Sequence, residues 1–159
     1  GKYKKMWDIQ QGVDIRDDEH TSNIDATTLK RIPLLADLDN DYLESLGKEF
    51  DIQHAEEGEI IIHENTTGQN FYIISSGKVN ITKVIDKRET KLATLEIGAF
   101  FGEISLIKSS LTTATVTADQ YCVLLRLSKS KFNAFIDSLP EMQKKLINNT
   151  IKKRLAKQH

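Results

Sequence analysis

The 159-residue sequence predicts an α+β fold, an antiparallel, jelly-roll-like β-roll flanked by N-terminal and C-terminal helices. Two observations predict it. Residues 51–127 consist of short β-branched and aromatic runs separated by turn residues, and helical spacing of apolar residues occurs on both sides of this region. Repeated short strands favour a closed roll, because closure leaves few exposed strand edges. The length suits one domain with a sizeable core.

The first 25 residues are polar and rich in acidic side chains, so we expect an N-terminal arm or linker that relies on the rest of the chain for order. Its apolar residues are Met6, Trp7 and Ile9, among a few others. Two environments are open for these three residues: the body of the domain, or a partner protein. The remaining residues, 26–159, are predicted to form the domain.

Residues 26–50 carry helical signals. Asp25 is placed to cap a short helix that ends before Pro33, because the residue before a proline disfavours helical geometry. A second helix is expected to begin at Asp39 or Asn40, both of which are good N-cap residues. Its apolar face is predicted to consist of Tyr42, Leu43, Leu46 and Phe50.

The strands of the roll are expected within residues 51–127. The stretch "TTATVTA" alternates, so its threonines and its apolar residues should lie on opposite faces of one strand: Thr113, Thr115 and Thr117 against Ala114, Val116 and Ala118. Between two apolar runs, the residues Ser75, Ser76 and Gly77 predict a tight hairpin, with Gly77 supplying a positive φ.

Residues 128–158 return to helical spacing. Ser128 or Ser130 is expected to cap one helix, and Pro140 suits the start of the next. The last helix is predicted to present one apolar face, since its aliphatic residues recur at intervals of four: Ile147, Ile151 and Leu155.

The composition narrows the class of function. A net charge of −1 gives no basic field for nucleic acid, and no apolar run is long enough to insert into a membrane. Without a signal-peptide pattern, a cytoplasmic protein is expected. The lone Cys122 lies in an apolar run and is read as a buried hydrophobic residue. The four histidines share no metal-ligand spacing, and no catalytic motif occurs, so we expect neither an enzyme nor a metal or cofactor.

The stretch "GAFFGEISLI" is the candidate for ligand chemistry. Gly102 precedes a possible helical turn, and glycine lets backbone N–H groups approach an anion. Glu103 would repel a phosphate but could accept a ribose hydroxyl. On residue chemistry alone, an ordinary β-turn is slightly favoured over a ligand site.

Residues 29 to about 139 resemble the cyclic nucleotide-binding domain family, and "FGEISLIKSSLTTATV" is similar to its phosphate-binding cassette. Glycines stand where the family places them, at Gly58, Gly68, Gly77, Gly98 and Gly102. The resemblance implies the β-roll fold and a ligand site formed by Phe101, Gly102, Glu103, Ile104, Ser105, Thr112, Thr113 and Ala114.

The resemblance also implies a role for individual residues. Glu103 would accept the ribose 2′-OH, the Gly102 backbone would lie against the sugar–phosphate ring, and the Ser105 amide would face the phosphate. Thr113 matches a threonine that contacts phosphate or guanine in some members. The base would pack on Ile and Val side chains of the roll and on Ile147 or Ile151 of the last helix.

Thr112 departs from the family pattern, which usually has an arginine here to pair with the cyclic phosphate. Threonine has no charge and no bidentate fork. Losing such a partner costs about 2–5 kcal/mol, which is roughly thirty- to several-thousandfold in affinity. By proximity in sequence alone, Lys108, Arg88 and Lys91 are candidates to replace the arginine.

Three functional readings follow. The first is a regulatory, ligand-sensing module that binds a cyclic nucleotide with weakened or altered phosphate recognition. Its C-terminal helices would pass the signal to a host effector, such as a kinase or channel, that is not in this chain. The second is a nucleoside-binding regulatory domain, and the third is a scaffold without ligand. We place them in this order because a scaffold would not need the Gly102, Glu103 and Ser105 combination.

Overall fold

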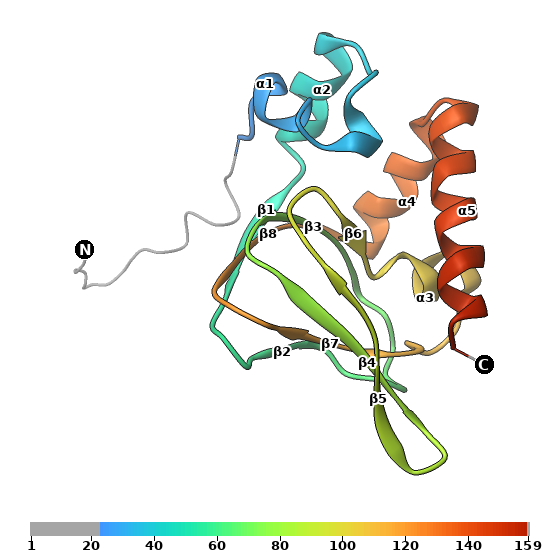
Figure 1. Ribbon diagram of the computed structural model, residues 1–159. Coiled ribbons are helices and arrows are strands. Elements are labelled where there is room, and N and C mark those ends of the chain that lie inside the picture. Colours follow the sequence, from blue (N-terminus) through green and yellow to red (C-terminus); the bar gives the residue numbers. More distant parts are fainter. Residues whose placement is uncertain (1–22, 159) are drawn as a thin grey trace.

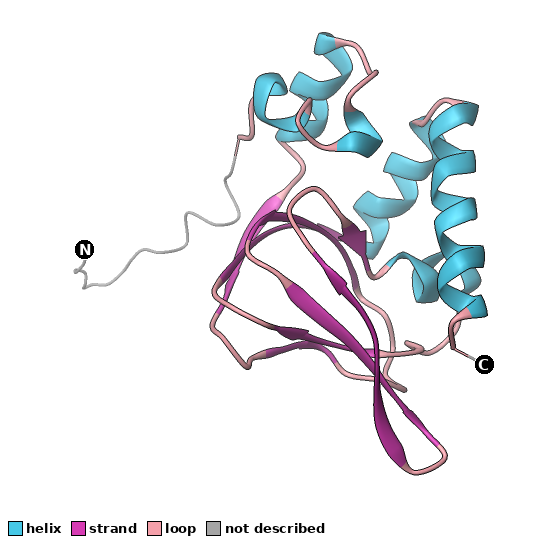
Figure 2. Ribbon diagram, viewed as in Figure 1, coloured by secondary structure: helices cyan, strands magenta, loops and turns pink. Residues whose placement is uncertain are grey.

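The computed structural model describes residues 23–158 and has the predicted architecture, a β-roll with helices beside it (Figures 1 and 2). Two four-stranded antiparallel sheets form the roll, with strand orders β1-β8-β3-β6 and β2-β7-β4-β5. The strands are β1 (Asp51–Ala55), β2 (Ile60–Ile62), β3 (Asn70–Ser76), β4 (Val79–Ile85), β5 (Arg88–Leu95), β6 (Phe100–Phe101), β7 (Thr115–Ala118) and β8 (Cys122–Ser128).

The N-terminal helices begin where their caps predict. They are α1 (Ala26–Leu29), the 3-10 helix η2 (Pro33–Leu35) and α2 (Asn40–Gly47). The Asp25 carboxylate accepts a hydrogen bond from the Thr28 amide at 2.8 Å. Asp39, rather than Asn40, caps α2 by accepting from the amides of Asp41 and Tyr42. Met6, Trp7 and Ile9 lie outside the described residues.

The alternation of "TTATVTA" is confirmed. The side chains of Ala114, Val116 and Ala118 are buried, whereas the threonines between them are half-buried on the other face. Strand β7 therefore has an apolar side and a hydroxyl side, as period-2 geometry requires.

The turn at Ser75–Gly77 is not a hairpin, so that prediction was wrong. Strands β3 and β4 lie in different sheets, and the turn carries the chain from one layer of the roll to the other. The positive φ of Gly77 is confirmed at +94°. A Cβ atom at this position would lie 2.7 Å from the Cys122 sulfur and would also collide with the Tyr121 carbonyl.

Because of this crowding, we expect alanine to lower the free energy of unfolding more at Gly77 than at a second glycine with similar backbone geometry. Gly58 has φ +86°, and a Cβ atom there would meet nothing within 4 Å. Alanine at either position should lose about 1–2 kcal/mol through left-handed strain. Gly77→Ala should lose about 1–3 kcal/mol more, because it overpacks the crossing. Urea unfolding of both variants measures this difference, and equal losses would contradict the steric argument.

The C-terminal helices are α4 (Lys129–Ser138) and α5 (Glu141–Ala156), and α3 (Glu103–Lys108) lies between β6 and β7 in the chain. Ser128 holds the N-cap position of α4, but its side chain makes no capping hydrogen bond to the helix backbone, and Pro140 holds the N-cap position of α5. In the described part of the chain, none of the helices combines the length and the apolar character needed to span a membrane.

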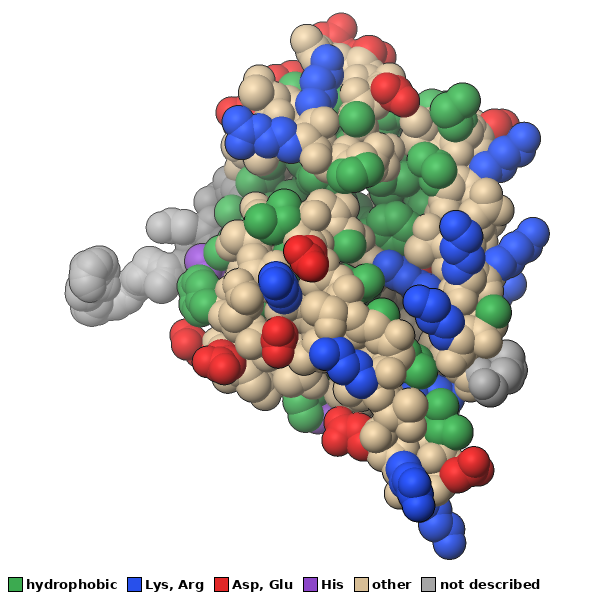
Figure 3. Space-filling model, viewed as in Figure 1, with side chains coloured by type: hydrophobic (Ala, Val, Ile, Leu, Met, Phe, Trp, Pro, Cys, Tyr) green, Lys and Arg blue, Asp and Glu red, His purple; other side chains and the backbone are tan. Residues whose placement is uncertain are grey.

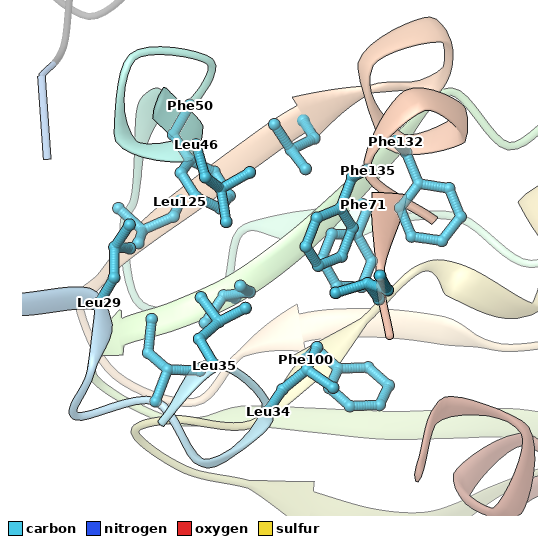
Figure 4. Packing of buried hydrophobic residues seen from close by; sticks show 14 of the residues in the cluster. Leu29, Leu34, Leu35, Leu46, Phe50, Phe71, Phe100, Leu125, Phe132 and Phe135 are labelled. Carbon is cyan, nitrogen blue, oxygen red and sulfur yellow. The ribbon is translucent and has the colours of Figure 1, made fainter. Parts of the chain in front are cut away.

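The larger core lies between the helices and the sheet that contains β3 and β8 (Figure 4). Its centre is aromatic, with ring centroids of Phe71 and Phe132 4.7 Å apart and those of Phe71 and Phe100 5.7 Å apart. Ile147 and Ile151 of α5 are buried in this core, so the predicted apolar face of the last helix is confirmed. The smaller core lies between the two sheets of the roll.

Candidate functional site

A cavity of about 260 Å³ opens between the roll, α3 and the last turns of α5. Its wall includes every site residue predicted from the sequence: Phe101, Gly102, Glu103, Ile104, Ser105, Thr112, Thr113 and Ala114. We call residues 101–116 the cassette segment. Apolar strand residues complete the roll side: Ile62, Ile81, Leu92, Ala93, Leu95 and Val116. Helix α5 and the two residues that follow it close the other side with Thr150, Lys153, Arg154, Lys157 and Gln158.

Gly102 makes the sharp change of direction between β6 and α3. Its φ is +91°, and a Cβ atom here would lie 2.6 Å from the Asn70 carbonyl oxygen. Only glycine fits both conditions without strain. The preceding Phe101 stacks on Tyr72 with centroids 4.9 Å apart, which fixes the strand end from which Glu103 enters the cavity wall.

Glu103 is fully buried and forms an ion pair with Arg154 of α5. Arg154 Nη1 donates to the two carboxylate oxygens at 3.0 and 2.9 Å. Arg154 Nη2 donates to the Phe100 carbonyl at 2.8 Å, and the guanidinium lies 5.1 Å from the centre of the Phe100 ring. Burial raises the pKa of Glu103 above its ordinary value, although the Arg154 charge offsets part of that rise. Arg154 therefore keeps α5 attached to the cassette segment.

The Arg154 contact was missed in the sequence. The two partners are 51 residues apart, and Arg154 is one of several cations on the last helix. Figure 3 shows Lys and Arg side chains gathered over this helix. The sequence contains no local signal that would single out one of them.

Thr112 is 6% exposed, and its hydroxyl group is already committed to backbone partners. The hydroxyl donates its single hydrogen to the His63 carbonyl. It accepts a hydrogen bond from the Thr66 amide at 2.9 Å, and the Thr66 hydroxyl lies 3.2 Å away. Because a hydroxyl has only one hydrogen, Thr112 has none left for a phosphate oxygen.

The replacement cations suggested by sequence proximity do not line the cavity. Lys108, Arg88 and Lys91 are absent from its wall, so that expectation was wrong. Proximity in sequence failed because Lys108 is exposed at the end of α3, and the other two lie in the first half of β5, of which only the part from Leu92 onward lines the cavity.

Lys83 contacts the backbone of the cassette segment but does not line the cavity. Its ammonium donates to the Thr113 carbonyl at 2.8 Å and pairs with Glu64 at 3.7 Å. Among the described residues, every cation in the cavity wall comes instead from α5 or from the residue that caps its C-terminus: Lys153, Arg154 and Lys157.

Only some of the residues predicted to contact the base line the cavity. Ile62, Ile81 and Val116 of the roll line it, as expected for the Ile and Val side chains. Ile147 and Ile151 do not, because they point into the helical core, and the same helix turns Thr150 and Lys153 toward the cavity. Ser105 is buried beside Gly68, where a Cβ atom would collide with the serine hydroxyl. No group of three metal-ligating side chains occurs within residues 23–158.

The chain is similar to curated proteins of two kinds. It is 36% identical over 113 residues to the human potassium/sodium hyperpolarization-activated cyclic nucleotide-gated channel 4, covering 71% of this chain and 9% of that protein. It is 31% identical over 134 residues to a cGMP-dependent protein kinase of Drosophila melanogaster, covering 82% of this chain and 17% of the kinase. The chain thus spans less than a fifth of the length of either relative.

The chain is also similar to solved structures of regulatory subunits of protein kinase A. The regulatory subunit of a cAMP-independent protein kinase A from Trypanosoma brucei is 25% identical with a TM-score of 0.70, covering 76% of this chain and 44% of that one. A triple mutant of it, with one threonine replaced by arginine, is bound to cAMP in the A site (27% identity, TM-score 0.65, 68% and 40% covered). The Trypanosoma cruzi subunit bound to guanosine is 27% identical with a TM-score of 0.65, covering 68% and 39%.

The comparison with family models agrees with the cavity and the fold. The model described as the cyclic nucleotide-binding domain matches residues 52–138, which include the whole cassette segment and most of the roll. This match covers more than half of the chain, and the cassette residues lie together around one cavity. The chain belongs to the cyclic nucleotide-binding domain family.

Proposed function

We propose that this domain is a regulatory sensor whose cavity binds a ribonucleoside, with the ribose at Glu103 and no phosphate at Thr112. The observation that carries the proposal is the Thr112 hydroxyl, whose only hydrogen is given to the His63 carbonyl. Among the described residues, the cassette segment also contributes no cation to the cavity wall. A cyclic phosphate placed there would lose water without gaining a charged partner, which is unfavourable.

A ribose suits the wall on which Glu103 lies. A carboxylate offers about four lone-pair sites, and Arg154 uses one on each oxygen. The remaining sites can accept hydroxyl hydrogens. Arg154 also favours the ionised form of Glu103, which is the form that only accepts hydrogen bonds. A neutral sugar meets this carboxylate without the repulsion that a phosphate would feel.

The comparisons support this ligand class. The Trypanosoma cruzi subunit is bound to guanosine, a nucleoside, and the Trypanosoma brucei subunit is described as cAMP-independent. The mutant of the latter that is bound to cAMP carries an arginine in place of a threonine. The change is of the same kind as Thr112→Arg in this chain.

Weak binding of a cyclic nucleotide is the second candidate. It is favoured by the family match and by the similarity to a cyclic nucleotide-gated channel and a cGMP-dependent kinase. In that case the ring phosphate would depend on backbone amides of the cassette segment, including that of Ser105, and the affinity would suffer the loss expected for the missing arginine.

We also propose how the signal leaves the domain. Residues 26–159 would act as the sensing unit, with residues 1–25 as its arm, and α5 would report the ligand to an effector outside this chain. Helix α5 supplies one wall of the cavity and holds Glu103 through Arg154. A ligand that contacts both walls favours the arrangement in which α5 is docked, and this differential affinity shifts the population.

Calorimetric titration of the unmodified chain tests the proposal. Adenosine, guanosine, inosine, cAMP and cGMP are titrated in turn at the same ionic strength. We expect heat and a saturable isotherm with at least one nucleoside, and affinity for its cyclic nucleotide at least tenfold lower. Tighter binding of a cyclic nucleotide would support the second candidate and overturn the first. If none of the five ligands gives a binding isotherm, both candidates are contradicted, and the interpretation as a scaffold without ligand remains.

A further inference from the structure

We infer that a groove between α2 and α4 is the docking site for Trp7, in the N-terminal arm of the same chain. The groove is separate from the ligand cavity, since the two share no lining residue among those described. The inference is therefore independent of the proposed function. The sequence leaves two environments open for Trp7, the body of the domain and a partner protein, and the groove favours the first.

The groove has an apolar floor and a polar rim. Its volume is about 330 Å³, which accommodates an indole ring. Leu46 of α2 and Phe135 of α4 are buried at its floor, and Ala134 is exposed on its α4 side. The rim consists of hydroxyl groups and one pair of opposite charges: Tyr42, Ser45, Ser130, Ser138, Glu49 and Lys131. Tryptophan suits such a site, because its ring is apolar and its one N–H group needs an acceptor when buried.

Acceptors for the indole N–H are present on the α2 side of the rim. Within residues 23–158, no side-chain hydrogen bond engages the Ser45 hydroxyl, and the Glu49 carboxylate has only an ion pair with Lys131 at 4.0 Å. The hydroxyls of Tyr42 and Ser138 lie 2.6 Å apart and join the two helices at the other end of the groove. The groove is thus held open between two contacts, with its acceptors between them and toward Glu49.

The arm leaves the body of the domain next to this groove. The Ile24 amide donates to the Gly47 carbonyl at 3.0 Å, and Gly47 directly follows Leu46 of the groove floor. A Cβ atom at Gly47 would lie 1.8 Å from the Ile24 carbonyl oxygen, so the chain passes closely against the end of α2. Residues 8–23 can span roughly 50 Å when extended, whereas α2 is about 12 Å long. The groove is therefore within reach of Trp7.

The charges beside Trp7 complement those of α2. Lys4 and Lys5 precede Trp7 in the sequence. Helix α2 presents Asp41 and Glu44 to solvent and contains no basic residue. When Trp7 lies in the groove, the two lysines come near this acidic surface, and opposite charges attract over such distances.

A groove in the same chain has an advantage over a separate partner. A segment joined to its site by a short stretch of chain has an effective concentration on the order of millimolar. A modest contact is then sufficient for docking, whereas a separate partner would have to supply all of the affinity itself. The arm also contains few other apolar residues, so burying Trp7 removes much of its exposed apolar surface from water.

Trp7 is the only tryptophan of the sequence, so its fluorescence reports its own environment. The full chain should emit at a shorter wavelength than N-acetyltryptophanamide and should be quenched less by acrylamide. Ala134→Arg fills the groove with a charged side chain and should shift the emission to that of the free amide. Asn133→Arg is the matched control, because Asn133 is the exposed neighbour on α4 and does not line the groove.

Two further measurements keep the test decisive. Circular dichroism during urea unfolding shows whether each variant is folded. Ser45→Arg, on the opposite side of the groove, should shift the emission in the same way as Ala134→Arg and replaces that variant if it does not fold. Dilution of the unmodified chain should leave the emission unchanged, because docking within one chain does not depend on protein concentration.

Each outcome supports or contradicts the inference. Emission of the unmodified chain like that of the free amide would overturn it and leave Trp7 to a partner protein. Emission at short wavelength that persists in both folded groove variants would also overturn it, because Trp7 would be buried elsewhere. A shift on dilution would mean that the groove of a second copy holds Trp7, which contradicts docking within one chain. Protection that is lost in the groove variants and kept in Asn133→Arg and on dilution supports the inference.

Discussion

Replacing Arg154 with methionine should lower the free energy of unfolding by about 3–5 kcal/mol at neutral pH, the usual cost of breaking a buried ion pair from one side. Glu103 is fully buried, and Arg154 is its only cationic partner among the described residues. Without the arginine, the carboxylate keeps its desolvation cost and loses its countercharge. Glu103→Gln should cost less, because the side chain of Arg154 is 24% exposed and can turn toward water.

The loss in Arg154→Met depends on pH in a direction that follows from the pKa of Glu103. Burial already holds that pKa above the ordinary value, and removing Arg154 raises it further. The folded state then binds a proton more readily than the unfolded state, so the stability due to Glu103 falls as pH rises through the folded pKa. The deficit relative to the parent should therefore be small in acid, where Glu103 is protonated in both proteins, and should grow to a plateau as pH rises.

Urea unfolding at a series of pH values measures this deficit. Lys152→Met should change stability by no more than about 0.5 kcal/mol, as for other exposed sites. Adding Glu103→Gln to Arg154→Met should recover part of the loss, since both charges are then gone. A deficit that stays constant across pH would mean that the packing of the arginine stem matters, and the charge does not.

Replacing Thr112 with arginine should raise the affinity for cAMP or cGMP by roughly thirty- to several-thousandfold, the converse of losing a desolvated charged partner. Thr112 lines the cavity, and a change of threonine to arginine is one of the three substitutions in the Trypanosoma brucei subunit that is bound to cAMP. The substitution also removes the hydroxyl contacts to His63 and Thr66. Each is worth about 0.5–1.5 kcal/mol, so the variant should be somewhat less stable.

Thr112→Val is the matched control for this change. It removes the same hydroxyl contacts and keeps the shape, but it adds no charge. Calorimetry with cAMP and cGMP should therefore show a gain in Thr112→Arg and none in Thr112→Val. An equal gain in affinity in both variants would mean that the hydrogen bonds of Thr112 with His63 and Thr66 had kept the ligand out. The missing charge would then not be the reason for weak binding.

The sequence predicts best those features that depend on neighbouring residues. Asp25 and Asp39 cap their helices through amides two or three residues away, so the local pattern is sufficient. The alternation in β7 and the glycine at φ +91° before α3 are local in the same sense. The cassette residues of the site could be predicted from the sequence because they all lie in one continuous segment.

Features that depend on tertiary packing could not be predicted in the same way. The Gly77 turn was predicted correctly as a turn, but the pairing of strands decides whether a turn makes a hairpin, and β3 and β4 pair elsewhere. The spacing of Ile147 and Ile151 predicts a buried face without saying which neighbour covers it. Arg154 stands beside Lys152 and Lys153 on α5, and only the path of the helix across the cavity selects Arg154 for Glu103.

Phe100 contacts both the helical core and Arg154 at the cavity. Its ring contacts Phe71 in the helical core, and its carbonyl and ring also contact Arg154 at the cavity. Under the proposed function, this residue couples ligand affinity to core stability: a ligand that strengthens the contact of Arg154 with β6 also stabilises the aromatic packing behind it, and the reverse holds as well. Under the same proposal, sequence changes in the core, far from any ligand atom, would adjust the ligand concentration at which the cavity is filled.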